Sequence, residues 1–424
     1  MNKFFSVCAA AVLFCTGASF VCPAQETAIT ALAADAGTCG DQLSWTLGGD
    51  GTLTVKGSGK MTSAPWQGTS EQKKAIKKVV IENGVESIYD GAFQDCRSLK
   101  SVSLPSSLTA IGSSAFKNCG TLPAITIPNS VTTIGGSAFY NCASLTSITL
   151  PNKLKTIESY MFSDCSKLTD VSIPNSVTAI KHNAFYRCTS LTEAVLPPKL
   201  TSLGSSAFAY SGLITASIPG KLTDIGSNIF EECTNLRDVS LGSGLETIGQ
   251  FMFIGCSALE SVTIPDTIVS VLFSFWECSS LKSVSFPASV RNIYKPFDSC
   301  AHMEEIYIYN PKASIVEGLV TSGTQTPTAC KIFGYDGSTA ETLAKKQNLP
   351  FASLGAAPVQ APIRGDLNSD GRSNVQDAIL LARIITEDKT VKTNDAMLIA
   401  ADVNGDGEID VFDTVELLKS IAAS

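Results

Sequence analysis

Two segments of twelve residues near the C-terminal end, 366–377 and 402–413, carry the same spacing of oxygen-bearing side chains. These side chains stand at the first, third, fifth, ninth and twelfth places, and glycine stands at the sixth, where the backbone must turn sharply. Calcium takes six to eight oxygen ligands, and a main-chain carbonyl at the seventh place adds to such a set. The sequence predicts two calcium loops, one with the ligands Asp366, Asn368, Asp370, Arg372 (through its carbonyl), Asn374 and Asp377, the other with Asp402, Asn404, Asp406, Glu408 (through its carbonyl), Asp410 and Asp413.

Each predicted loop runs directly into a stretch with apolar residues at helical spacing. These stretches extend from Ala378 to Ile385 and from Val415 to Ile421. Between them, residues 394–401 predict a short helix capped by Thr393 or Asn394. We therefore expect a small all-α domain, which folds only with calcium bound because its loop carboxylates otherwise repel one another.

A duplicated loop–helix pair without incoming helices resembles a dockerin, and the resemblance covers Gly365 to about Ala422. The last ligand of each loop is aspartate, whereas the EF-hand pattern has glutamate. The resemblance implies that two calcium ions order the domain, and that it binds a cohesin module on a scaffolding protein of a fibre-degrading complex. In that family the two residues before the last ligand contact cohesin, and in this chain they are Val375, Gln376, Val411 and Phe412. Because the two pairs differ, they argue against two equivalent binding modes, and Phe412 is the candidate anchor.

The N-terminal end has the pattern of a secretory leader. Met1-Asn-Lys3 precedes an apolar run from Phe4 to Val21, which ends at the small-residue site Cys22-Pro-Ala24, with a second candidate site at Ala31-Leu-Ala33. No second apolar span follows, so we expect a secreted protein without a membrane partner, held at the cell surface through a scaffolding complex. The net charge of −8, without a basic stripe, argues against binding to nucleic acid.

The middle of the chain repeats itself. Phenylalanine recurs every 23 residues from Phe93 to Phe208, and cysteine follows three residues after most of these phenylalanines. In the unit at 145–165, the pattern Leu-x-x-Ile-x-Leu predicts a short strand with alternate side chains buried. A proline then ends the pairing, and a second extended segment carries Leu154 and Ile157.

These units resemble the 23-residue leucine-rich repeats of bacterial surface proteins, and ten of them fit between Ile76 and Cys300. The implied fold class is mainly β, a leucine-rich-repeat solenoid followed by the small all-α dockerin. The predicted organisation is a leader at 1–24 (or to 33), a β-rich N-terminal cap at 35–75, repeats at 76–312, a C-terminal cap at 313–354, a linker at 355–364 and the dockerin at 365–424.

The regularly spaced cysteines, from Cys96 to Cys300, allow two interpretations. A buried ladder of free thiols is favoured, because each thiol would point into the core as a small apolar group. Disulfides remain the alternative, since an exported protein normally meets oxidising conditions. A metal site is disfavoured, because the repeats contain no close Cys-x-x-Cys pair.

Alternate strand positions should point outward, from Ser101 and Ser103 to Glu305 and Tyr307. They predict a flat, hydroxyl-rich and nearly uncharged face, on which Tyr307 is the one aromatic platform. Such a face suits a protein partner first and a polysaccharide second. High strand propensity and solubility alone would also produce it, without any ligand.

The sequence offers little support for catalysis. His182 and His302 lie in separate repeats, and neither belongs to a metal-binding motif or to a nucleophile elbow. We therefore expect a secreted, non-catalytic cellulosome-type component that docks on cohesin and presents its repeats to a protein or glycan partner. A dockerin-borne glycoside hydrolase and a surface adhesin are the alternatives.

Overall fold

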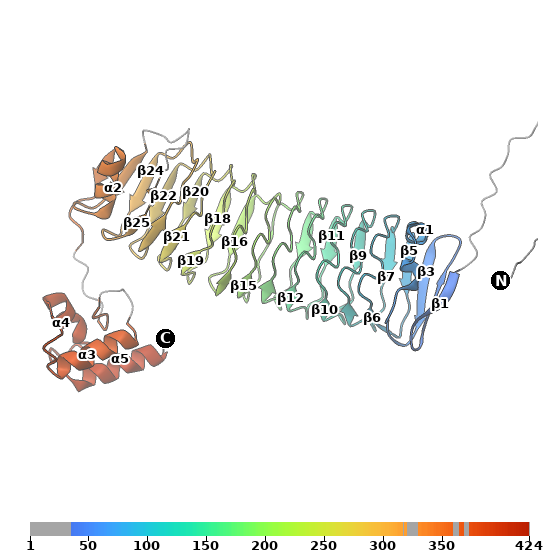
Figure 1. Cartoon of the computed structure of the whole chain (residues 1–424), viewed down its shortest axis with the longest axis horizontal. Coiled ribbons are helices and arrows are strands. Elements are labelled where there is room, and N and C mark those ends of the chain that lie inside the picture. Colours follow the sequence, from blue (N-terminus) through green and yellow to red (C-terminus); the bar gives the residue numbers. More distant parts are fainter. Residues whose placement is uncertain (1–34, 317, 320–329, 359–363, 369–372, 424) are drawn as a thin grey trace, which may run out of the picture.

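The computed structural model describes residues 35–316, 318–319, 330–358, 364–368 and 373–423 of the 424-residue chain (Figure 1). The predicted leader and two members of the first predicted calcium loop, Asp370 and Arg372, lie outside these residues. The described chain consists of a long array of stacked coils and a small helical domain, so the predicted fold class is confirmed.

An antiparallel meander begins the array. Strands β1 (Asp35–Gly40), β2 (Leu43–Leu47) and β3 (Thr52–Gly57) pair in order, and β3 then pairs in parallel with β5 (Lys78–Ile81). The 3-10 helix η1 (Pro65–Gln67) and helix α1 (Ser70–Ala75) lie between β3 and β5 in the chain. Trp66 of η1 is fully buried and stacks on the first phenylalanine of the repeats, Phe93, with ring centroids 5.7 Å apart.

One strand of each coil contributes to a parallel ladder, which we call the first ladder. Successive strands pair at an offset of one repeat, so that Ser147 lies opposite both Ala124 and Asp170. Alternate side chains along these strands are buried, as predicted. After β5, the first ladder contains β7 (Ser101–Ser103), β9 (Ala124–Thr126), β11 (Ser147–Thr149), β13 (Asp170–Ser172), β16 (Thr215–Ile218), β18 (Asp238–Leu241), β20 (Ser261–Thr263), β22 (Ser283–Phe286), β24 (Glu305–Ile308), β26 (Lys331–Gly334) and β27 (Phe351–Ser353).

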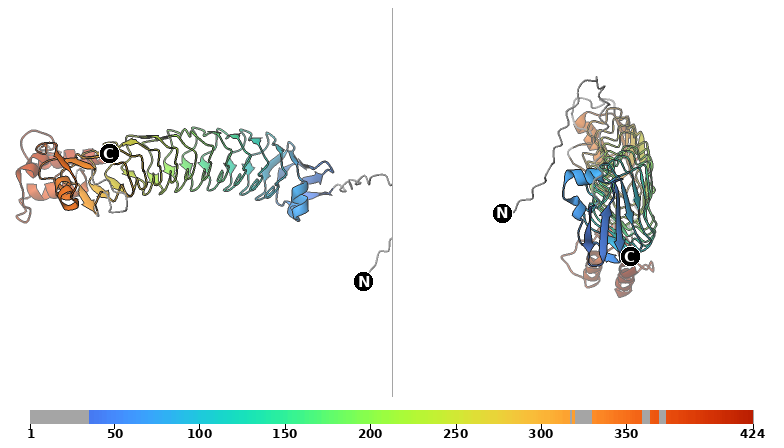
Figure 2. Two further views of the ribbon diagram at one scale, coloured as in Figure 1. Left: turned by 90° about the horizontal axis from the view of Figure 1, so that it is seen from above. Right: turned by 90° about the vertical axis from the view of Figure 1, so that its right-hand side faces the viewer.

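A second parallel ladder is built from the second extended segment of each coil. Figure 1 shows the two ladders along the array, and Figure 2 shows the coils stacked in one direction. The second ladder contains β4 (Gly59–Lys60), β6 (Val85–Ile88), β8 (Ala110–Ile111), β10 (Thr133–Ile134), β12 (Thr156–Ile157), β14 (Ala179–Ile180), β15 (Ser202–Leu203), β17 (Asp224–Ile225), β19 (Thr247–Ile248), β21 (Ser270–Leu272), β23 (Asn292–Tyr294) and β25 (Ser314–Val316).

The first ladder has no regular strand in one repeat, between β13 and β16, and its strand pairing also breaks between β7 and β9 and between β18 and β20. A strand was expected through Glu193 and Val195, but only Val195 pairs there, through a single parallel bridge to Ser217. Ala194 and Ala216 face inward at this point. The prediction of a regular strand in this repeat is therefore wrong.

A stack of phenylalanine rings forms the centre of the array. The rings from Phe93 to Phe297 are almost fully buried, and neighbouring centroids lie between 5.0 and 5.9 Å apart. Most neighbouring rings are nearly parallel, because successive coils repeat the same geometry. This stack and the inward residues of both ladders make one continuous core.

The repeated cysteines line this core as free thiols, so the favoured interpretation is confirmed for the described residues. The Sγ atom of Cys142 donates to the carbonyl oxygen of Phe116 at 3.2 Å, and the same contact recurs along the array at 3.0 to 3.2 Å. Ser211 takes the missing place and lies 3.3 Å from the Sγ atom of Cys233. The described cysteines include no disulfide.

The residue before several of these cysteines adopts a left-handed conformation that asparagine and aspartate tolerate. Asp95, Asn118 and Asn141 have φ values of 63°, 61° and 54°. Their side chains also bond to one another, since Asn118 Nδ2 donates to Asp95 at 2.8 Å and Asn141 Nδ2 donates to Asn118 at 3.0 Å. This side-chain ladder stabilises the turn between coils.

Four helices follow the repeats. Helix α2 (Thr339–Gln347) is capped by Ser338 and belongs to the array, whereas α3 (Val375–Ile385), α4 (Asp395–Ala401) and α5 (Val411–Ala423) form the helical domain. The helical domain has its own core of Leu367, Ala378, Leu381, Ala401 and Leu417. Among the described residues, no helix has both the length and the apolar composition needed to cross a membrane.

Candidate functional site

The second predicted calcium loop, 402–413, is a series of tight turns closed by its own side chains. The Oδ1 atom of Asn404 accepts from the amide of Asp406 at 2.8 Å. The Oδ1 atom of Asp406 accepts from the amide of Glu408 at 2.9 Å. Gly407, at the sixth place, has a φ of 89°, and this left-handed conformation explains the predicted glycine.

A buried aspartate closes the second loop. Asp413 has no exposed surface, and its Oδ1 accepts from the amide of Asn404 at 3.1 Å, while its Oδ2 accepts from the amide of Asp410 at 2.9 Å. The third, ninth and twelfth places of the loop are thereby joined at the start of α5. Asp410 also accepts from the amide of Phe412 at 2.8 Å, which orders the first turn of that helix.

The first loop repeats this closure in its described part. Asp377 is fully buried, and it accepts from the amide of Asn368 at 3.1 Å and from the amide of Asn374 at 2.9 Å. Asn374 and Asp377 form a capping box at the start of α3. Asp366 is also buried, at 6% exposed. The structure thus joins three of the predicted ligands of the first loop, Asn368, Asn374 and Asp377, through main-chain amides.

The donor chemistry of both loops fits a hard cation such as calcium. Carboxylate and amide oxygens are the ligands that calcium prefers, and the second loop supplies them from five side chains and the carbonyl of Glu408. Within the described residues, no three His, Cys, Asp or Glu side chains form a metal-binding group by themselves. The carboxylates instead accept hydrogen bonds from main-chain amides of their own loops, as with Asp402, which accepts from Gly405 at 2.8 Å.

The four predicted partner contacts all lie on the surface. Val375 and Gln376 begin α3, and Val411 and Phe412 begin α5; the exposed fractions of Val411 and Phe412 are 59% and 67%. Phe412 is thus the most exposed large apolar residue at the start of either helix. A phenylalanine side chain that is two-thirds exposed is typical of an anchor in a protein–protein interface.

Three residues of the predicted apolar stretches of these helices also lie on this surface. Ile379, Val415 and Leu418 are 56%, 44% and 46% exposed, whereas Leu417 is buried. Helical periodicity shows which positions share a face, but both faces of α5 carry apolar residues, so periodicity alone does not show which is covered. The signal that could identify the exposed face is the series Val411, Val415 and Leu418, spaced four and three residues apart.

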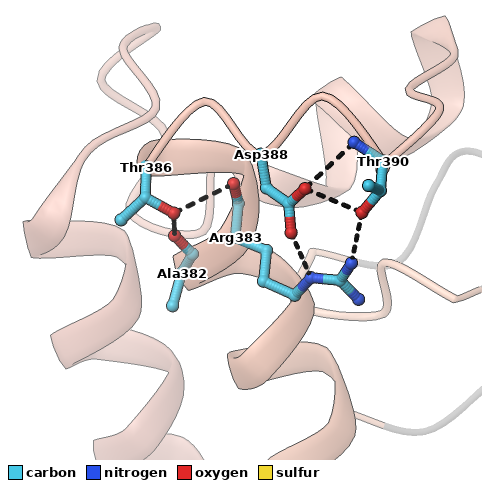
Figure 3. A network of polar contacts seen from close by, with 5 residues as sticks. All are labelled: Ala382, Arg383, Thr386, Asp388 and Thr390. Atoms are coloured by element: carbon cyan, nitrogen blue, oxygen red, sulfur yellow. Dashed lines mark hydrogen bonds and ion pairs between the residues drawn. The ribbon is translucent and has the colours of Figure 1, made fainter.

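A polar network fixes the turn after α3 (Figure 3). Arg383 donates from Nε to Asp388 at 2.9 Å and from Nη2 to the hydroxyl of Thr390 at 2.7 Å. Asp388 also accepts from the amide and the hydroxyl of Thr390, and these hydrogen bonds lower the pKa of Asp388 to about 2. The chain between α3 and α4 is therefore held by charge-assisted hydrogen bonds.

The outward face of the first ladder is hydroxyl-rich, as predicted, but it is not flat. A depression of about 370 Å³ lies over the interrupted repeat and is lined by Glu193, Val195 and Asp238 among others. A second, of about 480 Å³, lies over β20 and β22 and includes Tyr309. Both depressions form where serine and threonine side chains are too short to fill the space beside larger neighbours.

Tyr307 is not the one aromatic side chain on this face. Phe333 of the cap stacks on Tyr307 with centroids 4.3 Å apart, and Tyr309 lies nearly parallel to Tyr307 at 6.3 Å. The outward positions predicted from the repeats end at Tyr307, so Phe333, which lies in the cap, is not among them. The register Ser285–Tyr307–Phe333 shows that the ladder continues there.

The two histidines have structural partners in separate repeats. His182 Nδ1 lies 3.0 Å from the hydroxyl of Ser159, and His302 Nδ1 lies 2.6 Å from the carbonyl oxygen of Ser279. Both histidines are exposed, and the structure does not bring them together.

Comparison with known families matches both parts of the chain. The family model described as BspA type leucine rich repeat region matches residues 70–192, 155–273 and 256–322. The model of the dockerin type I domain matches residues 364–422. A search of the curated proteins found no match.

Solved structures of bacterial repeat proteins are also similar. A leucine-rich repeat protein from Bacteroides ovatus is 23% identical, over 63% of this chain and 93% of its own, with a TM-score of 0.43. A leucine rich cell surface protein from Faecalibacterium prausnitzii is 26% identical, over 65% of this chain and 95% of its own, with a TM-score of 0.36.

Proposed function

Since the chain belongs to the BspA-type leucine-rich repeat family and carries a dockerin type I domain, we propose that it is a secreted, non-catalytic subunit of a cellulosome-type assembly. Dockerin type I domains bind calcium and cohesin modules, and leucine-rich repeats are protein-interaction modules. Both matched families are non-catalytic. The dockerin attaches the protein to a scaffolding protein, and the repeats bind a second partner.

The helical domain takes two calcium ions, one in each loop. The ligands are the side chains at the five repeated places of each loop and the carbonyl oxygens of Arg372 and Glu408. Calcium supplies a centre on which the loop oxygens converge, so it offsets their mutual repulsion. Asp377 and Asp413 support this assignment, because each joins the third and ninth places at the start of a helix.

Cohesin binds chiefly to α5. The single observation that carries this proposal is the exposed apolar surface of Val411, Phe412, Val415 and Leu418 on one helix. On α3, the corresponding surface has only Val375 and Ile379. Because the two helices differ, one orientation on cohesin should be preferred over the flipped one.

The test is binding of the full chain to a panel of cohesin modules from scaffolding proteins. We expect at least one module to bind in calcium and to be released by a chelator. If no module in the panel binds in calcium, the proposed attachment is wrong. Capture of a separate protein by the repeats that persists in the presence of a chelator would identify the second partner.

A further inference from the structure

The two depressions on the first ladder form one groove. Both are lined by Ser261, Val262 and Thr263, so they meet over β20. The groove extends from Glu193 to Tyr309 and crosses five ladder spacings, which amounts to roughly 25 Å. A groove of this length and direction suits a linear chain that lies along the ladder.

The floor of the groove is built for hydrogen bonding with hydroxyl groups. Outward residues on its strands are mostly serine and threonine, and they can both donate and accept. Carboxylates of Asp238 and Asp266 flank them, while the apolar floor residues Val262 and Ile264 are almost completely buried. The main exposed apolar side chain that lines the groove is Val195, which is 70% exposed and lies at the end far from the C-terminal cap.

An aromatic wall stands at the end of the groove nearest the C-terminal cap, where Tyr309 lines the groove and Tyr307 lies beside Tyr309, outside the lining. One face of the Tyr307 ring packs on Phe333, while Ser285 lies next to Tyr307 on the other side of the ladder and is too short to cover the second face. Tyr307 donates its hydroxyl to Glu305 at 2.9 Å, which fixes the ring. Tyr309, 37% exposed, continues the wall at the edge of the groove.

We propose that this groove binds a neutral linear polysaccharide, with one sugar ring packed against the wall of Tyr307 and Tyr309. A pyranose ring presents C–H groups on its face and hydroxyl groups at its edge. The electron-rich face of an aromatic ring attracts the C–H groups, and the serine, threonine and aspartate side chains bond the hydroxyl groups. This site goes beyond the cohesin-dependent role and does not require it.

The charges favour a neutral glycan over an anionic one. Glu193, Asp238 and Asp266 line the groove, against Arg237 as its one lining cation among the described residues. A uronic-acid polymer would meet net repulsion along this surface. A neutral chain would meet only hydrogen-bonding groups and the aromatic wall.

The experiment is affinity electrophoresis of the full chain in gels that contain hydroxyethyl cellulose, xyloglucan, glucomannan or polygalacturonate. The wall is removed by Tyr307→Ser with Tyr309→Ala. Serine is the residue that the preceding repeat carries at this place, Ser285, so the coil should keep its fold. The matched control is Tyr89→Ser, which removes a tyrosine that is 43% exposed outside the groove.

We expect retardation by at least one neutral polysaccharide and none by polygalacturonate. The wall variant should lose affinity at least ten-fold, while the control variant should match the unmodified chain. The proposal is overturned if no neutral polysaccharide retards the chain, or if the wall variant binds as tightly as the control. The urea unfolding transition of the same variants, followed by tryptophan fluorescence of the array, reports separately on folding, and their cohesin binding reports separately on the proposed attachment.

Discussion

Asp377 and Asp413, 36 residues apart, are both fully buried, and each joins the amides at the third and ninth places of its own loop. A buried carboxylate is costly unless hydrogen bonds or a cation compensate it. The amides supply part of this compensation, and a calcium ion would supply the rest. We therefore expect calcium binding to stabilise the first turns of α3 and α5, because the same aspartate closes each loop and begins each helix.

Replacing Asp366 and Asp402 together by alanine should abolish calcium-dependent ordering of the helical domain. Both are first-place ligands, and ligand loss reduces the free energy that metal binding contributes to folding. The measurement is calorimetric titration of calcium into the full chain. Undiminished binding at both sites in the double variant would contradict the ligand assignment.

Glu408→Ala is the matched control, because this residue is assigned through its carbonyl oxygen and its side chain is exposed. Calcium binding by this variant should remain close to that of the unmodified chain. A loss as large as that of the double variant would mean that net charge, rather than coordination, governs binding.

Phe412→Ala should weaken cohesin binding by about 1–3 kcal/mol, because truncation removes an aromatic anchor. Val375→Ala, the smaller change at the start of α3, should cost less, since the exposed apolar surface is concentrated on α5. Calorimetric affinities of both variants for the same cohesin module test this asymmetry. Equal losses would instead support two equivalent orientations.

The thiol ladder should make the array sensitive to alkaline pH. Burial raises the pKa of Cys233 to about 11 and that of Cys96 to about 12, from an ordinary value of 9.0. The pKa values of these thiols are therefore higher in the folded chain than in the unfolded chain. The free energy of unfolding that this difference contributes is fully present below pH 9, and it is lost as the pH rises toward 11 and 12.

Ultraviolet absorbance of thiolates measures this difference. The folded chain should show little thiolate between pH 9 and 11, whereas the chain in urea should titrate near pH 9. Appearance of the thiolate signal near pH 9 in the folded chain would show that the ladder is accessible to water.

Phe139→Ala should destabilise the array by about 3–5 kcal/mol, because it leaves a cavity in the phenylalanine stack. Phe139 is fully buried between Phe116 at 5.5 Å and Phe162 at 5.7 Å. Urea unfolding followed by tryptophan fluorescence reports on the array, since Trp45, Trp66 and Trp276 all belong to it. Phe412→Ala, in the separate helical domain, should leave this transition unchanged, and a similar shift in both variants would contradict the expectation.

Local spacing was enough to predict the repeats, the thiol ladder and the short helix capped by Thr393 or Asn394, of which the structure selects Asn394. Each of these depends on residues within one coil or one turn, so a single unit contains the information. The interrupted strand at Glu193 and the exposure of Ile379 could not be predicted in this way. The first depends on how two neighbouring coils pair, and the second on which helix faces the shared core.

The sequence by itself determined the two families and the solenoid with its phenylalanine core, and it predicts the oxygen ligands of both loops, because these follow from residue type at fixed intervals. Only the tertiary structure decided that outward residues from separate repeats enclose a groove and that Phe333 of the cap completes an aromatic wall with Tyr307. It also decided that Val415 and Leu418 lie beside Phe412 on an exposed face. The physical reason is that a surface is formed by side chains brought together by stacking and helix packing, and spacing along the chain does not specify which faces remain uncovered.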